Sequence, residues 1–443
     1  MMSPMKVRVM GSFGGMIDRF TSSAETVSPA APSPEAEAVS CPAAEARGSV
    51  PVSVSLQPGR EKTRRAVTSR AVHRNECDLC NLPGCRTAAR MGFGNPVFRI
   101  IWYINVKITA FVQSIAPCYL FCYSLFMAID VLCIGHAAYD IYFPLDTFPE
   151  ENRKYKSGQF LESVGGPASN AAYLLGLWGV PAGFAGRVGG DSYGRAVLDD
   201  FQSVGVDTRL VEVREDFHTP LSCIINNRSN GSRTIINRRE DSEGLRLDAA
   251  KAAYLDELAG SARPPRFLLF DSHEHEASLK ALELFPRAVS VLDAGSARPA
   301  SVDLAEKVTH PVCSESFAQS KTGIDRLETD GELRRCAEIL RGINPSPGAV
   351  TLGDRGFVYW DERGIYAAES FRVKAVDTTG AGDIFHGAFV YALREGRGFD
   401  DALVFAAAAA ALSTKKQGGR ESVPSLPDVR ELAGSNKPEL RPL

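Results

Sequence analysis

A run of small residues beside a carboxylate is the strongest sign of chemistry in the sequence. It reads Asp-Thr-Thr-Gly-Ala-Gly-Asp and leads from Asp377 into the apolar segment IFHGAFVYAL. If a helix begins at Gly380, Ala381 and Gly382, their backbone N–H groups can face an anion, and the helix dipole adds to the attraction. Asp383 would then lie on the first turn, placed to take a proton from a nucleophile beside that anion. Phosphoryl transfer to an alcohol needs such an anion cradle and base. An ordinary helix N-terminus with a favourably placed aspartate is the structural alternative.

A second glycine-containing segment, Gly165-Gly166-Pro167-Ala168-Ser169-Asn170, also opens a predicted helix. The two glycines let a ligand approach the backbone, and Asn170 offers a hydrogen-bond donor and an acceptor to a polyol. A plain turn into a helix with proline at its first position would need the same residues. The segment is therefore a candidate for sugar binding.

A third candidate follows the strand-like residues Ala-Val-Thr-Leu and consists of Gly353, Asp354, Arg355 and Gly356. Two glycines in four residues indicate a tight turn. Such a turn can admit a nucleotide, or it can simply join two elements.

Short apolar strands alternate with helices and must position these motifs. Strands are expected over 130–135, 182–189, 266–271, 289–295 and 348–352, and helices over 168–177, 191–204, 276–285, 380–393 and 400–414. This alternation predicts an α/β fold with a mainly parallel sheet covered by helices.

Two stretches interrupt the alternation. Residues 141–164 and 221–239 have β character without crossover helices, and the second contains the turn signal Ser229-Asn230-Gly231 between two β-rich arms. A small sheet beside an α/β core, from about 138–165 and 220–240, is typical of a lid that excludes water from transfer chemistry.

The composition describes an ordinary globular chain with an unusual first part. Of 443 residues, 44% are hydrophobic and 23% charged, and the net charge is −3. No basic bias supports nucleic-acid or anionic-membrane binding. The balance hides a charge of +6 over residues 1–127 and −9 over the rest. We therefore expect one folded unit over 128–430 and a C-terminal tail over 431–443.

Residues 1–127 are expected to be largely disordered, because they bury too little apolar surface to offset the entropy of ordering. An apolar segment near 100–129 contains an uncharged run of membrane-spanning length, from Ile108 to Ile129. Three interpretations stay open: a membrane span, a transit peptide for a plastid or mitochondrion, or translation that starts at Met127. Phosphoryl transfer by the downstream residues would need ATP, which favours a location in the cytoplasm.

Two segments are candidates for metal binding. His73, Cys77, Cys80 and Cys85 offer zinc-type ligands on a short segment, although a second CxxC pair is missing. The run His273-Glu274-His275-Glu276 is either a metal cluster or the polar start of a helix.

His386, one turn after Asp383, either tunes the pKa of that base or merely occupies the helix face.

Together the motifs resemble those of the pfkB, or ribokinase-like, carbohydrate kinases. Asp-Thr-Thr-Gly-Ala-Gly-Asp reproduces the C-terminal signature of that family, and the stretches GGPASNAA and GRVGGDSYG reproduce the N-terminal one. The resemblance covers nearly all of residues 130–429. It implies a ribokinase-like three-layer sandwich with a β lid. TPLSCIINNRSNGSRTI is most similar to ketohexokinases, whereas KQGGRESVP looks more like bacterial and plant sugar kinases.

The resemblance also implies roles for matching residues. Asp383 corresponds to the catalytic base, and Gly380, Ala381 and Gly382 to the anion hole. Sugar contacts are implied at Asp140, Gly165, Gly166 and Asn170, nucleotide contacts at Arg233, Gly353, Asp354, Arg355, Gly356 and Gly418, and a monovalent cation such as K⁺ at Asp377 and Thr379.

Two positions depart from the family pattern. Pro167 replaces an asparagine that contacts the sugar in ketohexokinases, which weakens the case for fructose. The magnesium-linked motif Asn-x-x-Glu appears as Ser314-Glu315-Ser316-Phe317, with phenylalanine in place of the glutamate. Mg²⁺ is therefore expected to arrive mainly with ATP and through water.

The sequence thus predicts ATP-dependent phosphorylation of a sugar hydroxyl, with a ketose such as fructose as one candidate substrate. A nucleoside kinase of the same fold and a non-catalytic scaffold are the alternatives. A homodimer through the lid is expected from the family and from the exposed edges of such a sheet. No nucleic-acid or membrane partner is expected.

Overall fold

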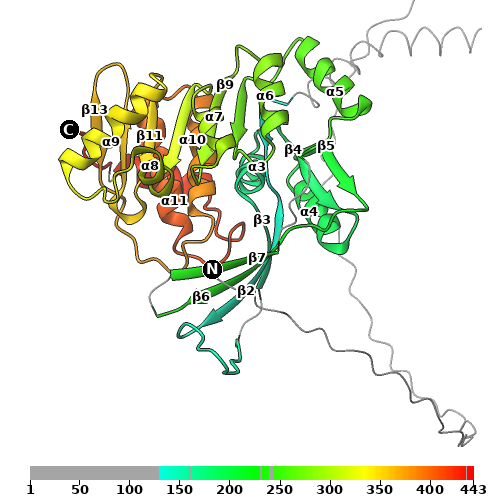
Figure 1. The fold of residues 1–443 in the computed structure, drawn as a ribbon, viewed down its shortest axis with the longest axis horizontal. Helices are drawn as coiled ribbons and strands as arrows, with labels where there is room; N and C mark the ends of the chain where they lie inside the picture. Colours follow the sequence, from blue (N-terminus) through cyan, green and yellow to red (C-terminus); the bar gives the residue numbers. More distant parts are fainter. Residues whose placement is uncertain (1–128, 159–160, 230–231, 239–243, 436) are drawn as a thin grey trace, which may run out of the picture. The chain divides into compact units, whose positions relative to one another are not determined.

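The computed structural model describes residues 129–443, apart from 159–160, 230–231, 239–243 and 436, and contains two sheets (Figure 1). The strands of the large sheet are β1 Val131–Ile134, β4 Ala182–Gly189, β5 Asp207–Arg214, β8 Phe267–Phe270, β9 Val289–Ala294, β10 His310–Ser314, β11 Gly348–Thr351, β12 Phe357–Trp360, β13 Ile365–Ala368 and β14 Arg441–Pro442. The predictions of disorder over residues 1–127, of zinc ligands and of a transit peptide fall outside this part of the chain, as do all but the last residue of the uncharged run Ile108–Ile129 and the turn signal at Asn230-Gly231.

Ten strands form the large sheet in the order β14-β13-β12-β11-β10-β9-β8-β1-β4-β5. Neighbours from β5 to β11 pair in parallel, and β12, β13 and β14 continue the sheet antiparallel. The predicted mainly parallel sheet is confirmed. Parallel strands need crossover connections, and helices supply them here.

The helices cover both faces of this sheet. They are α3 Pro167–Leu177, α4 Ser192–Ser203, α5 Ala249–Gly260, α6 His275–Leu284, α7 Pro299–Ala305, α8 Glu315–Thr322, α9 Asp330–Ile343, α10 Ala381–Arg394, α11 Phe399–Ser413 and α12 Leu426–Ser435. In β1, Val131 and Cys133 join a core with α3, α10 and α11, while Leu132 and Ile134 join a core with α5 to α9. A strand buried on both faces reads as continuously apolar, which explains the sequence of β1. The three-layer sandwich is confirmed.

The second sheet, called the lid below, contains β2 Ala138–Leu145, β3 Leu161–Gly165, β6 Leu221–Asn227 and β7 Ser232–Arg238. Its order is β3-β2-β6-β7, with antiparallel outer pairs and a parallel pair β2–β6 in the middle. The predicted small sheet is therefore present, although residues 146–158 carry no strand. Because β1 runs through Gly135–Ala137 straight into β2, the lid begins at the carboxyl edge of the large sheet (Figure 1).

The helix α9, the end of α12 and the strand β14 were not predicted from the sequence. The capping box of α9, in which Thr329 and Glu332 exchange hydrogen bonds, is a signal that could have located that helix. Residues 431–443, expected as a tail, include the end of α12 and the strand β14. Among the described residues, no helix combines the length and apolarity needed to cross a membrane.

Candidate functional site

The predicted anion-binding turn opens α10. Gly380 is the N-cap in the left-handed conformation, with φ of 74°, and the first helical hydrogen bond runs from Ile384 N to Gly380 O. A Cβ at Gly380 would lie 3.2 Å from Gly419 Cα, so glycine also permits the C-terminal loop to pack here. N–H groups in the first turn of a helix lack partners within that helix. Gly380 and Gly382 are thus placed to receive an anion, whereas Ala381 N also makes a long hydrogen bond of 3.4 Å to Thr378 O.

Asp383 lies in this first turn and meets the second motif. Asn170 on α3 donates from Nδ2 to Asp383 Oδ2 over 2.6 Å, although the two residues are far apart in the sequence. Burial, with the nearby negative charge of Asp293, raises the pKa of Asp383 to about 7. A carboxylate with a pKa near neutrality is well matched to general-base catalysis.

The remaining predicted sugar contacts gather beside Asn170. Asp140 is buried on β2, and Ser222 on β6 hydrogen-bonds its carboxylate. A Cβ at Gly165 would fall 2.0 Å from Asp140 Oδ2, so the close approach of β3 to this carboxylate requires glycine. Burial raises the pKa of Asp140 to about 6. The structure therefore brings Asp140, Gly165 and Asn170 to one junction between the lid and α3.

Gly166 provides a test of how tightly this junction is built. Its φ is +100°, and a Cβ would lie 2.3 Å from His136 O. We expect Gly166→Ala to lower the free energy of unfolding by about 2 kcal/mol more than Gly179→Ala does, as measured by urea denaturation. Gly179 is the matched control, because its φ is also positive, at +77°, but its Cβ would enter open space. Equal losses in the two variants would contradict the close packing inferred for Gly166.

Arg420 is a buried residue of this site that the sequence did not reveal. Its Nε donates to Asn170 Oδ1 over 3.2 Å, and its terminal nitrogens bond Asp200 and Ser169. The guanidinium also lies 4.7 Å from the ring centre of Tyr173 and 4.9 Å from that of Phe201. Because Arg420 binds the amide oxygen, the amide nitrogen of Asn170 is directed to Asp383. The segment KQGGRESVP contains this residue, but no role for Arg420 was predicted, since its partners precede it by more than 200 positions.

Asp377 lies at the start of the same turn. Its Oδ1 accepts from Thr379 N at 2.9 Å, Thr379 Oγ1 at 2.7 Å and Asn226 Nδ2 at 3.0 Å, and its Oδ2 accepts from Gly418 N at 3.0 Å. The carboxylate is thus surrounded by donors, whereas Asn226 Oδ1 is a buried acceptor without a partner among the described residues. The monovalent-cation role of Asp377 and Thr379 stays a prediction.

The lid reaches the anion-binding turn through Arg233. This β7 side chain donates from Nη1 to Thr378 Oγ1 over 2.7 Å. The structure therefore brings Arg233 and Gly418 to the start of α10. Their nucleotide contacts stay predictions.

The Gly353–Gly356 turn has a clear structural role. It forms a 3₁₀ turn between β11 and β12, and a Cβ at Gly356 would fall 2.0 Å from Ala368 O. Arg355 pairs with Glu315 Oε1 at 2.5 Å, at the start of α8. Asp354 is exposed in the same turn. The nucleotide role of these four residues also stays a prediction.

Asp293 and His386 form a second pair beside the base. His386 Nδ1 lies 2.7 Å from Gly382 O and 3.2 Å from Asp293 Oδ2, and Nε2 lies 3.2 Å from Val312 O. Oxygen atoms thus face both ring nitrogens of His386. His386 therefore contacts the carbonyl of the anion-binding turn, and Asp293 supplies a charge that acts on Asp383.

The run 273–276 does not form a metal centre. His273 bonds Asp271, Glu274 pairs with Arg187, and His275 contacts Asp303. The run instead leads into α6, which begins at His275 with Glu274 as its N-cap. In the part of the chain that the structure describes, no three His, Cys, Asp or Glu side chains converge to hold a metal.

Comparisons with known proteins complete this description. The model of the pfkB family of carbohydrate kinases matches residues 128–426. The 5-dehydro-2-deoxygluconokinase of Halalkalibacterium halodurans is 28% identical over 321 residues, which cover 68% of this chain and 94% of that one. Fructokinase-1 of Zea mays is 27% identical over 293 residues, or 62% of this chain and 89% of the relative. The structure of Arabidopsis thaliana ribokinase with ribose and ATP shares the fold, with a TM-score of 0.58 and 23% identity over 70% of this chain and 99% of that one.

Proposed function

The chain belongs to the pfkB family of carbohydrate kinases, and we propose that it transfers the γ-phosphoryl group of ATP to a sugar hydroxyl. The observation that carries this proposal is the contact between Asn170 and Asp383 at the N-terminus of α10. A base, a polyol-binding amide and an anion-binding turn meet there. Relatives at 27–28% identity are named as sugar kinases.

The chemical step follows from this arrangement. Asp140 and Asn170 would hold sugar hydroxyls, and Asp383 would take the proton of the attacking hydroxyl. The sugar oxygen then bonds to the γ-phosphorus as the bond to the ADP oxygen breaks. The N–H groups of Gly380–Gly382 would stabilise the charge on the transferred group. Arg233, on the lid, would add positive charge and help exclude water.

The described residues do not build a magnesium cage of their own. Ser314 caps α8, and Phe317 is buried in the core where the family motif has a glutamate. Mg²⁺ usually binds through substrate phosphates, waters and only one or two carboxylates. We therefore propose that Mg²⁺ enters with ATP, where it would neutralise phosphate charge.

The sugar is the open part of the proposal. We propose a ketose such as fructose as one candidate, because the relatives include fructokinases and the segment 219–235 resembles ketohexokinases, although Pro167 weakens the case for fructose. The test is ATP-dependent ADP release with D-fructose, D-ribose, 5-dehydro-2-deoxy-D-gluconate and adenosine. Turnover with any of the sugars supports a sugar kinase and ranks the substrates. Turnover with adenosine alone would identify a nucleoside kinase, and silence across the panel would favour a scaffold.

The pH profile tests the role assigned to Asp383. Only the ionised form can accept a proton, and the pKa is about 7. We therefore expect kcat/KM to rise as the pH is raised through about 7 and then to level off. The groups that act on Asp383 are Asn170 from α3, Arg233 from β7, Asp293 from β9 and His386 on α10.

Asp293→Asn gives this profile a directional check. Removing the negative charge of Asp293 lowers the cost of ionising Asp383, so the acid limb should move to lower pH. The measurement is kcat/KM between pH 5.5 and 9 in both proteins, a range of about 1.5 to 2 units on each side of the expected midpoint. An acid limb that stays in place, or moves to higher pH, would contradict the assignment.

The lid also suggests an assembly. Every described residue of the edge strand β7 is exposed, including Ile236 with 58% of its surface accessible. Exposed apolar side chains on an unpaired edge favour association. We propose that two copies associate through their lids. Sedimentation tests this, because wild type should then sediment as a dimer and Ile236→Lys as a monomer.

A further inference from the structure

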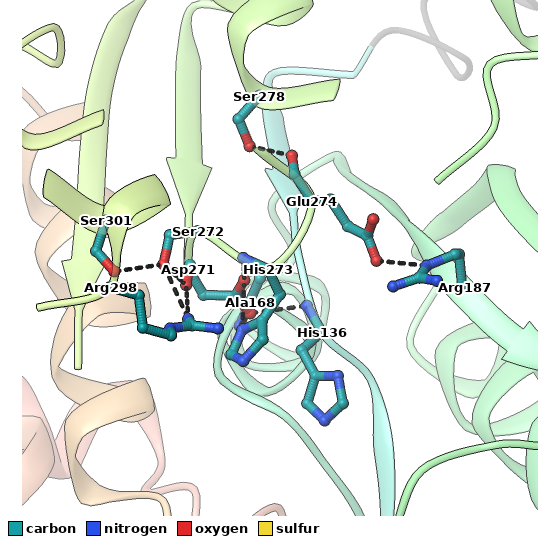
Figure 2. Close-up of polar contacts among 10 residues, drawn as sticks. All are labelled: His136, Ala168, Arg187, Asp271, Ser272, His273, Glu274, Ser278, Arg298 and Ser301. Carbon is teal, nitrogen blue, oxygen red and sulfur yellow. Dashed lines mark hydrogen bonds and ion pairs between the residues drawn. The ribbon is translucent and has the colours of Figure 1, made fainter. Parts of the chain in front are cut away.

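The turn after β8 holds a buried carboxylate that has no part in the mechanism above. Asp271 follows β8 directly and is only 2% exposed. Its Oδ2 accepts from the backbone N–H of His136 at 2.8 Å and of Ala168 at 3.1 Å, and its Oδ1 accepts from His273 N at 3.0 Å. Figure 2 shows these groups converging. Three segments that are distant in the sequence therefore meet at one side chain.

Two of these segments carry the predicted sugar contacts. His136 belongs to the loop between β1 and β2, which leads to Asp140. Ala168 lies in the first turn of α3, between Gly166 and Asn170. The carboxylate of Asp271 thus ties the loop before Asp140 to the turn before Asn170.

The backbone packs closely around the side chain of Asp271. A Cβ at Gly135 would fall 2.1 Å from Asp271 Oδ1, so the chain passes directly against the carboxylate. Burial alone would raise the pKa of Asp271, but the charge and hydrogen bond of His273 and the contacts of His136 bring it well below its ordinary value. The group is therefore ionised and held by N–H donors.

The third segment is turned back toward Asp271 by a left-handed residue. Ser272 has φ of 66°, which is uncommon for a residue other than glycine. Arg298 Nη2 donates to its Oγ at 3.0 Å, and that Oγ lies 3.1 Å from Ser301 Oγ (Figure 2). The turn places His273 Nδ1 3.1 Å from Asp271 Oδ1 and the His273 ring 4.8 Å from that of His136. Backbone strain of this kind persists only where the surrounding structure holds it.

We propose that Asp271 is a positioning residue for the sugar: its carboxylate fixes the β1–β2 loop and the first turn of α3 relative to each other, so that Asp140, Gly166 and Asn170 face the substrate as one rigid set. The inference rests on the proposed function. It assigns Asp271 no contact with the substrate itself.

Asp271→Asn tests this with little change in shape. Because both oxygens of Asp271 accept from N–H groups, either orientation of the amide sets its NH₂ against another donor. Asp361→Asn is the matched control. Asp361 is 3% exposed and follows β12, and its two oxygens likewise accept from N–H groups, namely Arg363 N, Gly364 N and Arg363 Nε. Its turn lies at the other end of β12 from Gly353–Gly356.

The kinetic readout separates sugar from nucleotide. With the panel sugar that wild type uses, we expect Asp271→Asn to raise the KM for the sugar about a hundredfold, because displaced contacts bind poorly. The KM for ATP should stay within about twofold, and Asp361→Asn should change neither value appreciably. A sugar KM no higher than in Asp361→Asn, or a parallel rise in both KM values of Asp271→Asn, would overturn the proposal.

Hydrogen exchange keeps the inference independent of the substrate. In Asp271→Asn, peptides covering residues 131–145 and 166–177 should exchange faster than in wild type and in Asp361→Asn. If wild type turns over no probe, the proposed function fails, and exchange alone then decides: unchanged rates in both peptides would overturn the positioning role.

A second variant covers failure of Asp271→Asn to fold. His273→Phe retains a ring beside His136 but removes the Nδ1 donor to Asp271. We expect it to raise the sugar KM about tenfold without changing the KM for ATP, since one of the bonds that hold the carboxylate is lost. If Asp271→Asn fails to fold, wild-type kinetics in His273→Phe would count against the proposal.

Discussion

Asp383→Asn is expected to lower kcat about a thousandfold or more while the protein stays folded, because an amide cannot take the proton of the sugar hydroxyl. Asparagine has the same shape as aspartate and can still accept the hydrogen bond from Asn170. Binding of both substrates should therefore survive, with the loss confined to the chemical step. Initial rates at saturating sugar and ATP measure this loss.

Stability provides the control for this variant. The pKa of Asp383 is raised to about 7 in the folded protein, above the ordinary value of 3.8 that applies to the unfolded chain. The ionised form of Asp383 therefore lowers the free energy of unfolding, and this loss is complete above a pH of about 7. A neutral amide at this position removes the loss. We expect the Tm of Asp383→Asn at pH 8 to equal or exceed that of wild type. A normal kcat would refute the role of Asp383 as base, and a lowered Tm would show that its loss of activity reflects unfolding.

Arg420→Ala should have the largest effect on stability. The substitution leaves Asp200 without its partner, releases Ser169 and Asn170, and removes the guanidinium from the rings of Tyr173 and Phe201. Breaking a buried ion pair typically costs about 3–5 kcal/mol. Because the Asp200 side chain is 30% exposed and water screens it, we expect a loss near the lower end, about 3 kcal/mol by urea denaturation.

Arg420→Lys separates stability from positioning. Lysine retains a cation for Asp200, but it lacks the planar guanidinium that binds Asp200, Ser169 and Asn170 together. We expect it to recover most of the stability and to keep a kcat/KM about tenfold or more below wild type, because the Asn170 amide is no longer directed to Asp383. Full recovery of both properties would show that Arg420 acts only through stability.

The sequence located the parts of the site that have local signals. Gly380–Gly382 and Gly165–Gly166 stand next to apolar helices, so a helix N-terminus was predictable at each. The β6–β7 hairpin was likewise marked by its β-rich arms. Asp383 and Asn170 could be proposed one by one, although their 2.6 Å contact depends on the packing of α3 against α10.

The residues that were missed act at long range. Arg420, Asp271 and Asp293 are single charged residues without a repeating pattern, and each gains its role from partners on other elements. The run 273–276 looked like a metal cluster because four potential ligands are consecutive. Only His275 and Glu276 of this run lie in α6, and separate partners bind His273, Glu274 and His275.

The parallel pairing of β2 with β6 bears on the order in which the protein folds. The hairpin β6–β7 is local in sequence, whereas β2 pairs with β6, with Tyr139 opposite Leu221, only across the intervening segment β3–α3–β4–α4–β5. Closing so long a loop is slow unless the segment between is already ordered. Asp140 enters through β2 and Arg233 through β7, so the two sides of the site join when this pair forms. We therefore expect the chain to gain a core before the two sides of the site meet, so that a partly folded chain is compact but inactive.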